Sequence, residues 1–292
     1  MPHFVTSDNV QIYYEEKGEG LPIIFIHGWT QTHTMYSKPI GVLSSKYRCI
    51  SFDLRGCGAS TTPRTGLSMA KCARDVKELI EYLDLDRVSL FGMSLGASII
   101  YAYARDYGCL YLDRVVIAEM PPKLISDSQW IYGMYRGKFT AEDALKNLAW
   151  MFDDFDGYTF WHTKQCLPEA YDIPNFPPEL RSPYKLDLLP GPMVPTFAKG
   201  YCRDFRPYPD IALAYSTLYE DYHEDLAKIT VPAAVMWGNP GSIYLPEAMQ
   251  YVADHVSGPV VRLEYKPATH MIIGEHFQKV IRDVIAFMDA EY

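Results

Sequence analysis

The chain has 292 residues, of which 48% are hydrophobic and 22% charged, a balance that is ordinary for a globular protein. Its net charge of −9 argues against nucleic acid or an anionic membrane as the main partner. No stretch approaches the roughly 18 apolar residues of a membrane-spanning helix. The N-terminus lacks the basic and apolar segments of a signal peptide, and the six cysteines form no C-x-x-C pair. We therefore expect a cytoplasmic protein with one large α/β domain, or with one domain that carries an insertion.

Apolar, strand-like runs alternate with amphipathic helical patterns over most of the chain. Strands are predicted at Val10–Glu16, Leu21–Ile26, Arg48–Phe52, the run before Gly92, Arg114–Ala118, Pro232–Trp237 and Val260–Tyr265. Helices are predicted after Ser68, after Gly96, at Pro246–Val256 and from Phe277 to Met288. This alternation is typical of a mostly parallel central sheet with helices on both faces.

Residues 121–225 differ in character from the rest of the chain. These 105 residues contain 20 of the 41 aromatic residues and 12 of the 21 prolines. Proline at that density interrupts long helices. We predict a core formed by residues 1–120 and 226–292, with an inserted helical cap at 121–225. Short helices are expected in the cap around Asp127–Gly137, Ala141–Asp153 and Ile211–Leu226.

The sequence Gly92-Met93-Ser94-Leu95-Gly96 lies between an apolar strand and a helical pattern. A G-x-S-x-G in this context indicates a nucleophile elbow, a sharp turn that exposes a serine hydroxyl above the sheet edge. The same turn directs the backbone N–H of Leu95 at the space where an oxyanion would form. Ser94 is therefore the candidate nucleophile.

A serine hydroxyl is a weak nucleophile and needs a base within hydrogen-bond reach. His270 is the candidate, because it lies in a polar loop between the last strand and the last helix. No pair of histidines has the spacing of zinc ligands with a third partner, so no metal site is predicted.

Four motifs together resemble the α/β-hydrolase superfamily, in its esterase, haloperoxidase-like and C–C-hydrolase-like branch. They are His27-Gly28-Trp29, the segment 53–60, Gly92–Gly96 and Thr269-His270-Met271, in the order that the family has. The resemblance implies the α/β-hydrolase fold, and an oxyanion hole from the backbone N–H groups of Trp29 and Leu95. It implies no metal and no organic cofactor.

The acid of the expected triad is harder to place. Similar enzymes carry it in a Trp-Gly-x-x-Asp pattern, where this chain has Gly241. A second known position in the superfamily follows the strand after the elbow helix, where this chain has Glu119. A carboxylate at the end of an apolar strand is costly to bury without a partner, which a histidine N–H would provide. We predict Glu119 as the acid. The alternatives are that Glu119 only tethers the cap, that Glu247 reaches in, or that the triad is incomplete.

The aromatic residues of the cap are candidates for an apolar binding pocket, namely Trp130, Tyr135, Trp150, Phe160 and Trp161. The leading hypothesis is a serine hydrolase that cleaves a carboxylic ester or lactone. We expect a small-molecule substrate of small to medium size, apolar or aromatic, and a Ser-His-Glu triad that forms an acyl-enzyme. One alternative is a cofactor-free C–C hydrolase or dioxygenase-like enzyme that uses the histidine and acid as a base. A third, favoured only by Gly241, is a ligand receptor on a hydrolase fold.

Overall fold

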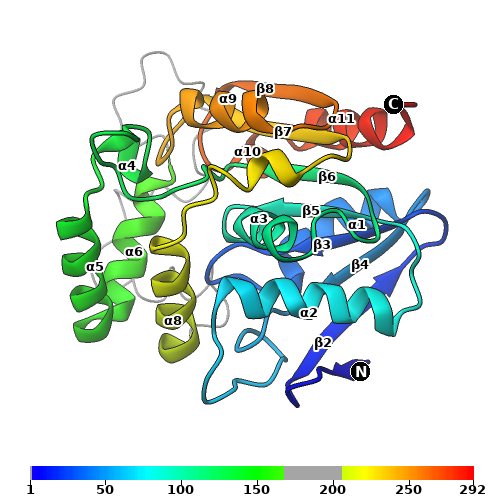
Figure 1. Ribbon diagram of the computed structural model, residues 1–292, viewed down its shortest axis with the longest axis horizontal. Coiled ribbons are helices and arrows are strands. Elements are labelled where there is room, and N and C mark those ends of the chain that lie inside the picture. Colours follow the sequence, from blue (N-terminus) through cyan, green and yellow to red (C-terminus); the bar gives the residue numbers. More distant parts are fainter. Residues whose placement is uncertain (1, 168–205) are drawn as a thin grey trace.

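A central eight-stranded sheet organises the protein (Figure 1). The computed structural model describes residues 2–167 and 206–292. The strands are β1 (His3–Val5), β2 (Gln11–Lys17), β3 (Pro22–Ile26), β4 (Arg48–Phe52), β5 (Val88–Met93), β6 (Leu112–Ala118), β7 (Ala233–Pro240) and β8 (Val260–Ala268). Their order in the sheet is β1-β2-β4-β3-β5-β6-β7-β8. The pairs β1/β2 and β2/β4 are antiparallel and all the others are parallel.

Helices pack on both faces of this sheet and create two hydrophobic cores. One core contains residues of α2 (Met69–Tyr82), α3 (Leu95–Tyr107) and α9 (Pro246–His255), and the other contains residues of α1 (Ser37–Leu43) and α11 (Phe277–Asp289). Neighbouring residues of β5 divide between them, since Leu90 belongs to the first core and Phe91 to the second. That is the alternation that a strand buried on both faces requires. Short helices complete this part of the fold, namely η1 (His33–Tyr36), η6 (Leu226–Lys228) and α10 (Ile272–Glu275).

A helical insertion lies at the end of the sheet where the parallel strands finish (Figure 1). Its described helices are α4 (Met134–Gly137), α5 (Ala141–Asp153), α6 (Phe155–Gln165) and α8 (Pro207–Leu218). They span residues 134–218, inside the range predicted for the cap, whose boundaries at 121 and 225 stay a prediction. A capping box between Thr140 and Asp143 fixes the start of α5, because each side chain bonds the other residue's backbone N–H.

Two predicted cap helices differ from those observed. Of the predicted segment 127–137, only residues 134–137 form a short helical turn, and within it Tyr135 and Arg136 have left-handed φ and ψ. The carboxylate of Asp127 accepts the N–H groups of Gln129 and Trp130, a local turn that competes with a helix. The segment predicted at 211–226 instead begins at Pro207 and ends at Leu218. Beyond that end, the N–H of Tyr222 donates to the carbonyl of Pro122, which ties the chain back to the core.

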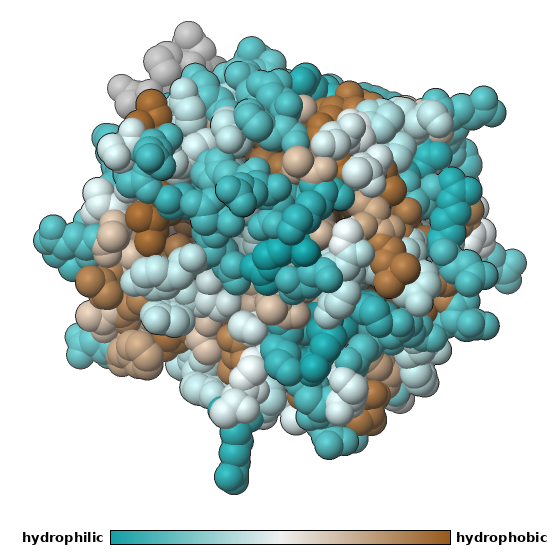
Figure 2. All heavy atoms as spheres, viewed as in Figure 1, coloured by the Kyte–Doolittle hydropathy of each residue, from teal (hydrophilic) through white to brown (hydrophobic). Residues whose placement is uncertain are grey.

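The surface is mainly polar on the face shown in Figure 2, where hydrophobic residues form only small, separate groups. None of the helices in the described part of the chain combines the length and apolarity needed to cross a bilayer.

Candidate active site

Ser94 sits in a strained turn between β5 and α3, with φ 55° and ψ −125°. The flanking glycines make this turn possible. A Cβ on Gly92 would lie 2.4 Å from the carbonyl oxygen of Gly96, and one on Gly96 would lie 2.1 Å from the carbonyl oxygen of Ile26. The N–H of Ser94 donates to the carbonyl of Ala118 at 2.9 Å, which fastens the turn to β6. The elbow geometry predicted from the glycine pattern is therefore present.

Glu119 and His270 meet at the edge of the sheet. Nδ1 of His270 lies 3.0 Å from Oε2 of Glu119, whose residue is only 1% exposed. The other carboxylate oxygen, Oε1, accepts the backbone N–H of Gly238 at 2.5 Å. A buried carboxylate beside Nδ1 favours the tautomer in which Nδ1 carries the proton and donates it. The second nitrogen of His270, Nε2, is then the basic one.

The loop that carries His270 is fixed by a second buried contact. The backbone N–H of His270 donates to Oγ of Ser242 at 2.8 Å, and Ser242 is fully buried. The ring of Tyr244 packs edge-on against the imidazole, with 5.4 Å between the ring centroids. The first contact fixes the backbone of His270, and the second packs against its ring.

The usual position of the acid cannot supply one here. Gly241 has φ +74°, and a Cβ on it would lie 2.3 Å from the carbonyl oxygen of Tyr244. Glu247, the other carboxylate considered, is exposed in the first turn of α9. Glu119 itself bonds Gly238 and His270 and makes no hydrogen bond to the described residues of the cap. Of these candidates, Glu119 is the one that contacts the histidine.

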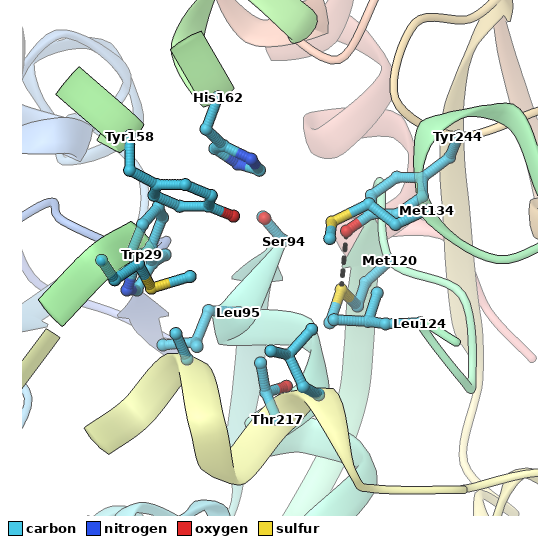
Figure 3. Close-up of a pocket in the computed structure, with 13 residues that line it drawn as sticks. Trp29, Ser94, Leu95, Met120, Leu124, Met134, Tyr158, His162, Thr217 and Tyr244 are labelled. Carbon is cyan, nitrogen blue, oxygen red and sulfur yellow. Dashed lines mark hydrogen bonds between the residues drawn. The ribbon is translucent and has the colours of Figure 1, made fainter. Parts of the chain in front are cut away.

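Ser94 opens onto a cavity whose far wall belongs to the cap (Figure 3). The described residues that line it are Trp29, Ser94, Leu95, Met120, Leu124, Met134, Met151, Tyr158, His162, Ala214, Thr217, Leu218 and Tyr244. The cavity has a volume of about 50 Å³. A cavity that holds one water molecule needs roughly 10–15 Å³ on the same scale. The described walls therefore suit a small, mainly apolar group.

Within the described chain, no hydrogen bond joins Oγ of Ser94 to His270. Such contacts often tighten only when substrate is bound. The backbone N–H groups of Trp29 and Leu95 likewise have no acceptor among residues 2–167 and 206–292. Both residues line the cavity beside Ser94. Two donors in this position could receive the negative oxygen of a tetrahedral intermediate.

The cap aromatics proposed from the sequence do not line the described cavity. Trp130 is buried elsewhere and donates from its indole N–H to the carbonyl of Lys123. Trp161 packs against Tyr135 and Trp150, behind the cavity wall. Phe160, on α6, is also absent from the described lining.

The side chains that α6 presents to the cavity are instead Tyr158 and His162. They lie four residues apart, so they share a helix face, and that spacing was the available signal. In Figure 3 the hydroxyls of Ser94 and Tyr158 and the ring of His162 surround one space.

In the described parts of the chain, no cluster of three His, Cys, Asp or Glu residues has the arrangement of a metal site. The candidate site consists of a serine on a strained turn, a histidine with a buried carboxylate, and two backbone donors.

The chain belongs to the α/β-hydrolase family, since residues 22–277 match the family model for the alpha/beta hydrolase fold. It is 34% identical to the AB hydrolase superfamily protein YisY of Bacillus subtilis (strain 168), over 83% of each chain. It is 26% identical to the non-heme chloroperoxidase CPO-A1 of Kitasatospora aureofaciens, over 99% of this chain and all of that one. Among solved structures, an esterase from Exiguobacterium antarcticum superposes with a TM-score of 0.83 over 99% of both chains, at 21% identity.

Proposed function

We propose that the protein is a serine hydrolase that cleaves small, uncharged carboxylic esters or lactones. The observation that carries the proposal is the 3.0 Å contact between Nδ1 of His270 and the buried carboxylate of Glu119. A histidine oriented in this way, on the same sheet edge as an elbow serine, is the arrangement that acyl transfer requires. Related proteins include an esterase and chloroperoxidases, so the family supports the enzyme class and leaves the substrate open.

In the proposed reaction, Nε2 of His270 removes the proton of Ser94 while Oγ attacks the carbonyl carbon. The carbonyl oxygen becomes negative and is held by the N–H groups of Trp29 and Leu95. Each such donor typically contributes about 3–4 kcal/mol to the transition state. The imidazolium, stabilised by Glu119, then protonates the leaving alkoxide. Water attacks the acyl group with His270 as base, which releases the acid and restores Ser94.

Covalent labelling tests the nucleophile directly. A fluorophosphonate should label the wild-type protein on Ser94, and peptide mapping should find the adduct there. The Ser94→Ala variant should take up no label and should hydrolyse none of a panel of 4-nitrophenyl esters and small lactones. Labelling that persists in Ser94→Ala would refute the assignment.

Two observations favour a second function, that of a cofactor-free C–C hydrolase or dioxygenase-like enzyme. The proposed acid follows β6 rather than β7, and Ser94 makes no hydrogen bond to His270 in the described structure. In that reaction His270 and Glu119 would deprotonate the substrate, and Ser94 would help to hold it. Oxygen consumption with hydroxy-ketone or quinolone compounds, together with inert esters, would favour this function over ester hydrolysis.

A further inference from the structure

The cap contributes an imidazole ring to the mainly apolar wall of the cavity. His162, on α6, lines the cavity together with Ser94 and lies edge-on to the indole of Trp29, with 5.3 Å between ring centroids. It plays no part in the hydrolytic steps described above. Its neighbours determine which ring nitrogen carries the proton.

Nδ1 of His162 is occupied by a tyrosine. Oη of Tyr135 lies 2.7 Å from Nδ1, and it lies 3.3 Å from Oη of Tyr158. The shorter contact is an ordinary strong hydrogen bond, whereas the longer one exceeds the usual range for two hydroxyls. A phenol is a better donor than acceptor toward a neutral imidazole nitrogen. We therefore infer that the hydroxyl of Tyr135 donates its hydrogen bond to Nδ1 of His162.

With Tyr135 as the donor, Nδ1 of His162 is the acceptor of this hydrogen bond. The remaining nitrogen, Nε2, then carries the N–H of the neutral ring.

Two further observations support a neutral His162 ring whose Nδ1 is held by Tyr135. Burial, with a smaller contribution from the nearby His270, lowers the pKa of His162 to about 3, so the ring is neutral near pH 7. Tyr135 has φ +53°, a conformation that costs a non-glycine residue free energy. The following residue, Arg136, donates its backbone N–H to the carbonyl of Ile243, which secures this strained turn to the core.

The Nε2–H of His162 has no acceptor among the described residues, and the ring borders the cavity above Ser94 (Figure 3). A donor that faces a small apolar cavity is costly to leave without a partner. We propose that His162 is a specificity-determining residue, whose Nε2–H donates a hydrogen bond to an oxygen of the substrate other than the scissile carbonyl. The preferred substrates are small esters or lactones with an ether, keto or hydroxyl oxygen close to the reacting carbon. This inference rests on the proposed hydrolase function.

Matched substrates test the preference. 4-Nitrophenyl methoxyacetate and 4-nitrophenyl butyrate have acyl chains of equal length and differ by one oxygen in place of a methylene. 2-Methoxyethyl acetate and n-butyl acetate make the same comparison in the alcohol part. In one of the pairs, the ratio of kcat/KM for the ether to that for the alkyl ester should fall about tenfold or more in His162→Leu. Use of the same pair in wild type and variant cancels the intrinsic reactivity of the esters.

Two other variants separate specificity from structure. His162→Gln keeps a donor near the position of Nε2 and should recover part of the ratio. Tyr135→Phe removes the group that fixes the tautomer and should lower the ratio without touching the substrate. Ratios that stay within about twofold of wild type for both pairs in a folded His162→Leu protein would overturn the proposal.

A measurement without turnover separates failure of this inference from failure of the proposed function. In protein with ¹⁵N-labelled histidine, the side-chain nitrogen resonances report which ring nitrogen of His162 is protonated. We expect the proton on Nε2 in the wild type and a mixture of tautomers in Tyr135→Phe. A wild-type proton on Nδ1 would overturn the inference even if esters are cleaved. A proton on Nε2 in a protein that cleaves no ester would leave the donor in place and remove the hydrolytic function.

Discussion

Nδ1 of His270 and Oε2 of Glu119 lie 3.0 Å apart across 151 residues of sequence, and the carboxylate is buried. The contact joins the end of β6 to the loop after β8, two strands that are not neighbours in the sheet. The intervening strand, β7, contributes the N–H of Gly238 to the second oxygen of Glu119. Three chain segments therefore determine the position of one carboxylate.

Glu119→Gln should lower kcat by about 10³–10⁴-fold with little change in KM, because the amide favours the wrong histidine tautomer and cannot stabilise the imidazolium. The amide oxygen can still accept the N–H of Gly238, so the variant should stay folded. Steady-state kinetics on a 4-nitrophenyl ester, with thermal denaturation alongside, check this. A loss of less than about tenfold would contradict the role of Glu119 as the acid.

An aspartate at position 241 should not replace the missing acid. Gly241 has φ +74°, and any Cβ there meets the carbonyl oxygen of Tyr244. Gly241→Asp in a Glu119→Ala background should therefore leave activity at the level of Glu119→Ala alone. Recovery to within about tenfold of wild type would show that the loop adapts to carry a functional acid.

The Gly241→Ala variant measures how much a Cβ at this position destabilises the fold, without adding a carboxylate. It should lower the free energy of unfolding by about 1–3 kcal/mol, because a left-handed residue gains a Cβ with no room for it. Gly41→Ala is the matched control, since no atom lies within 4 Å of a Cβ built there. It lies inside α1 and should stabilise by up to about 1 kcal/mol. Urea denaturation measures both changes, and equal effects at the two positions would contradict the argument.

Ser242→Ala should destabilise the protein and also slow catalysis. Its Oγ accepts the backbone N–H of His270 in a fully buried setting, so its removal leaves that donor without a partner. The expected cost is about 1–3 kcal/mol of unfolding free energy. The control Ser45→Ala removes an exposed hydroxyl that bonds the carbonyl of Val42, and should change stability by less than about 0.5 kcal/mol. If kcat stays unchanged in Ser242→Ala while stability falls, the serine supports the loop without positioning His270.

Protonation of His162 should make the protein less stable in acid. Its pKa is lowered to about 3 in the folded state, against about 6.5 for an exposed histidine. Between these values the unfolded chain binds a proton that the folded protein does not, so stability falls as the pH drops below 6.5. The loss from this group at pH 5 is about 2 kcal/mol. Urea denaturation at pH 7.5 and pH 5 should show a smaller difference in His162→Gln than in the wild type, and an equal difference would contradict the shift.

The elbow could be predicted from sequence because steric contact imposes it. Neither Gly92 nor Gly96 has room for a Cβ, so the motif itself encodes the approach of β5, α3 and β3. The prediction of Glu119 rested on a second acid position in the family that the sequence resembles, and on the cost of burying a carboxylate without a partner. Strand β1, by contrast, has only three residues. That is too few for an alternation of apolar and polar residues to distinguish a strand from a loop in the sequence.

The cavity wall was less predictable, for a geometric reason. On α6, Tyr158, Trp161 and His162 are neighbours on the helix surface, and all three are aromatic rings. Which of them faces the cavity depends on how α6 is rotated against the core, where Trp29 contacts both Tyr158 and His162. That rotation arises from long-range packing, and composition alone gives no sign of it.

The position of the proposed acid directly after β6 affects which parts of this fold can vary without moving the site. The backbone N–H of Ser94 donates to Ala118, and Glu119 follows directly, so the proposed nucleophile and the proposed acid lie at the ends of adjacent strands. The turn after β7 therefore does not need to provide a carboxylate. Its carbonyl oxygens at Pro240 and Gly241 instead accept hydrogen bonds from the guanidinium of Arg136. Replacement of the cap by another insertion would thus change the walls of the substrate cavity and leave the positions of Ser94 and Glu119 unchanged.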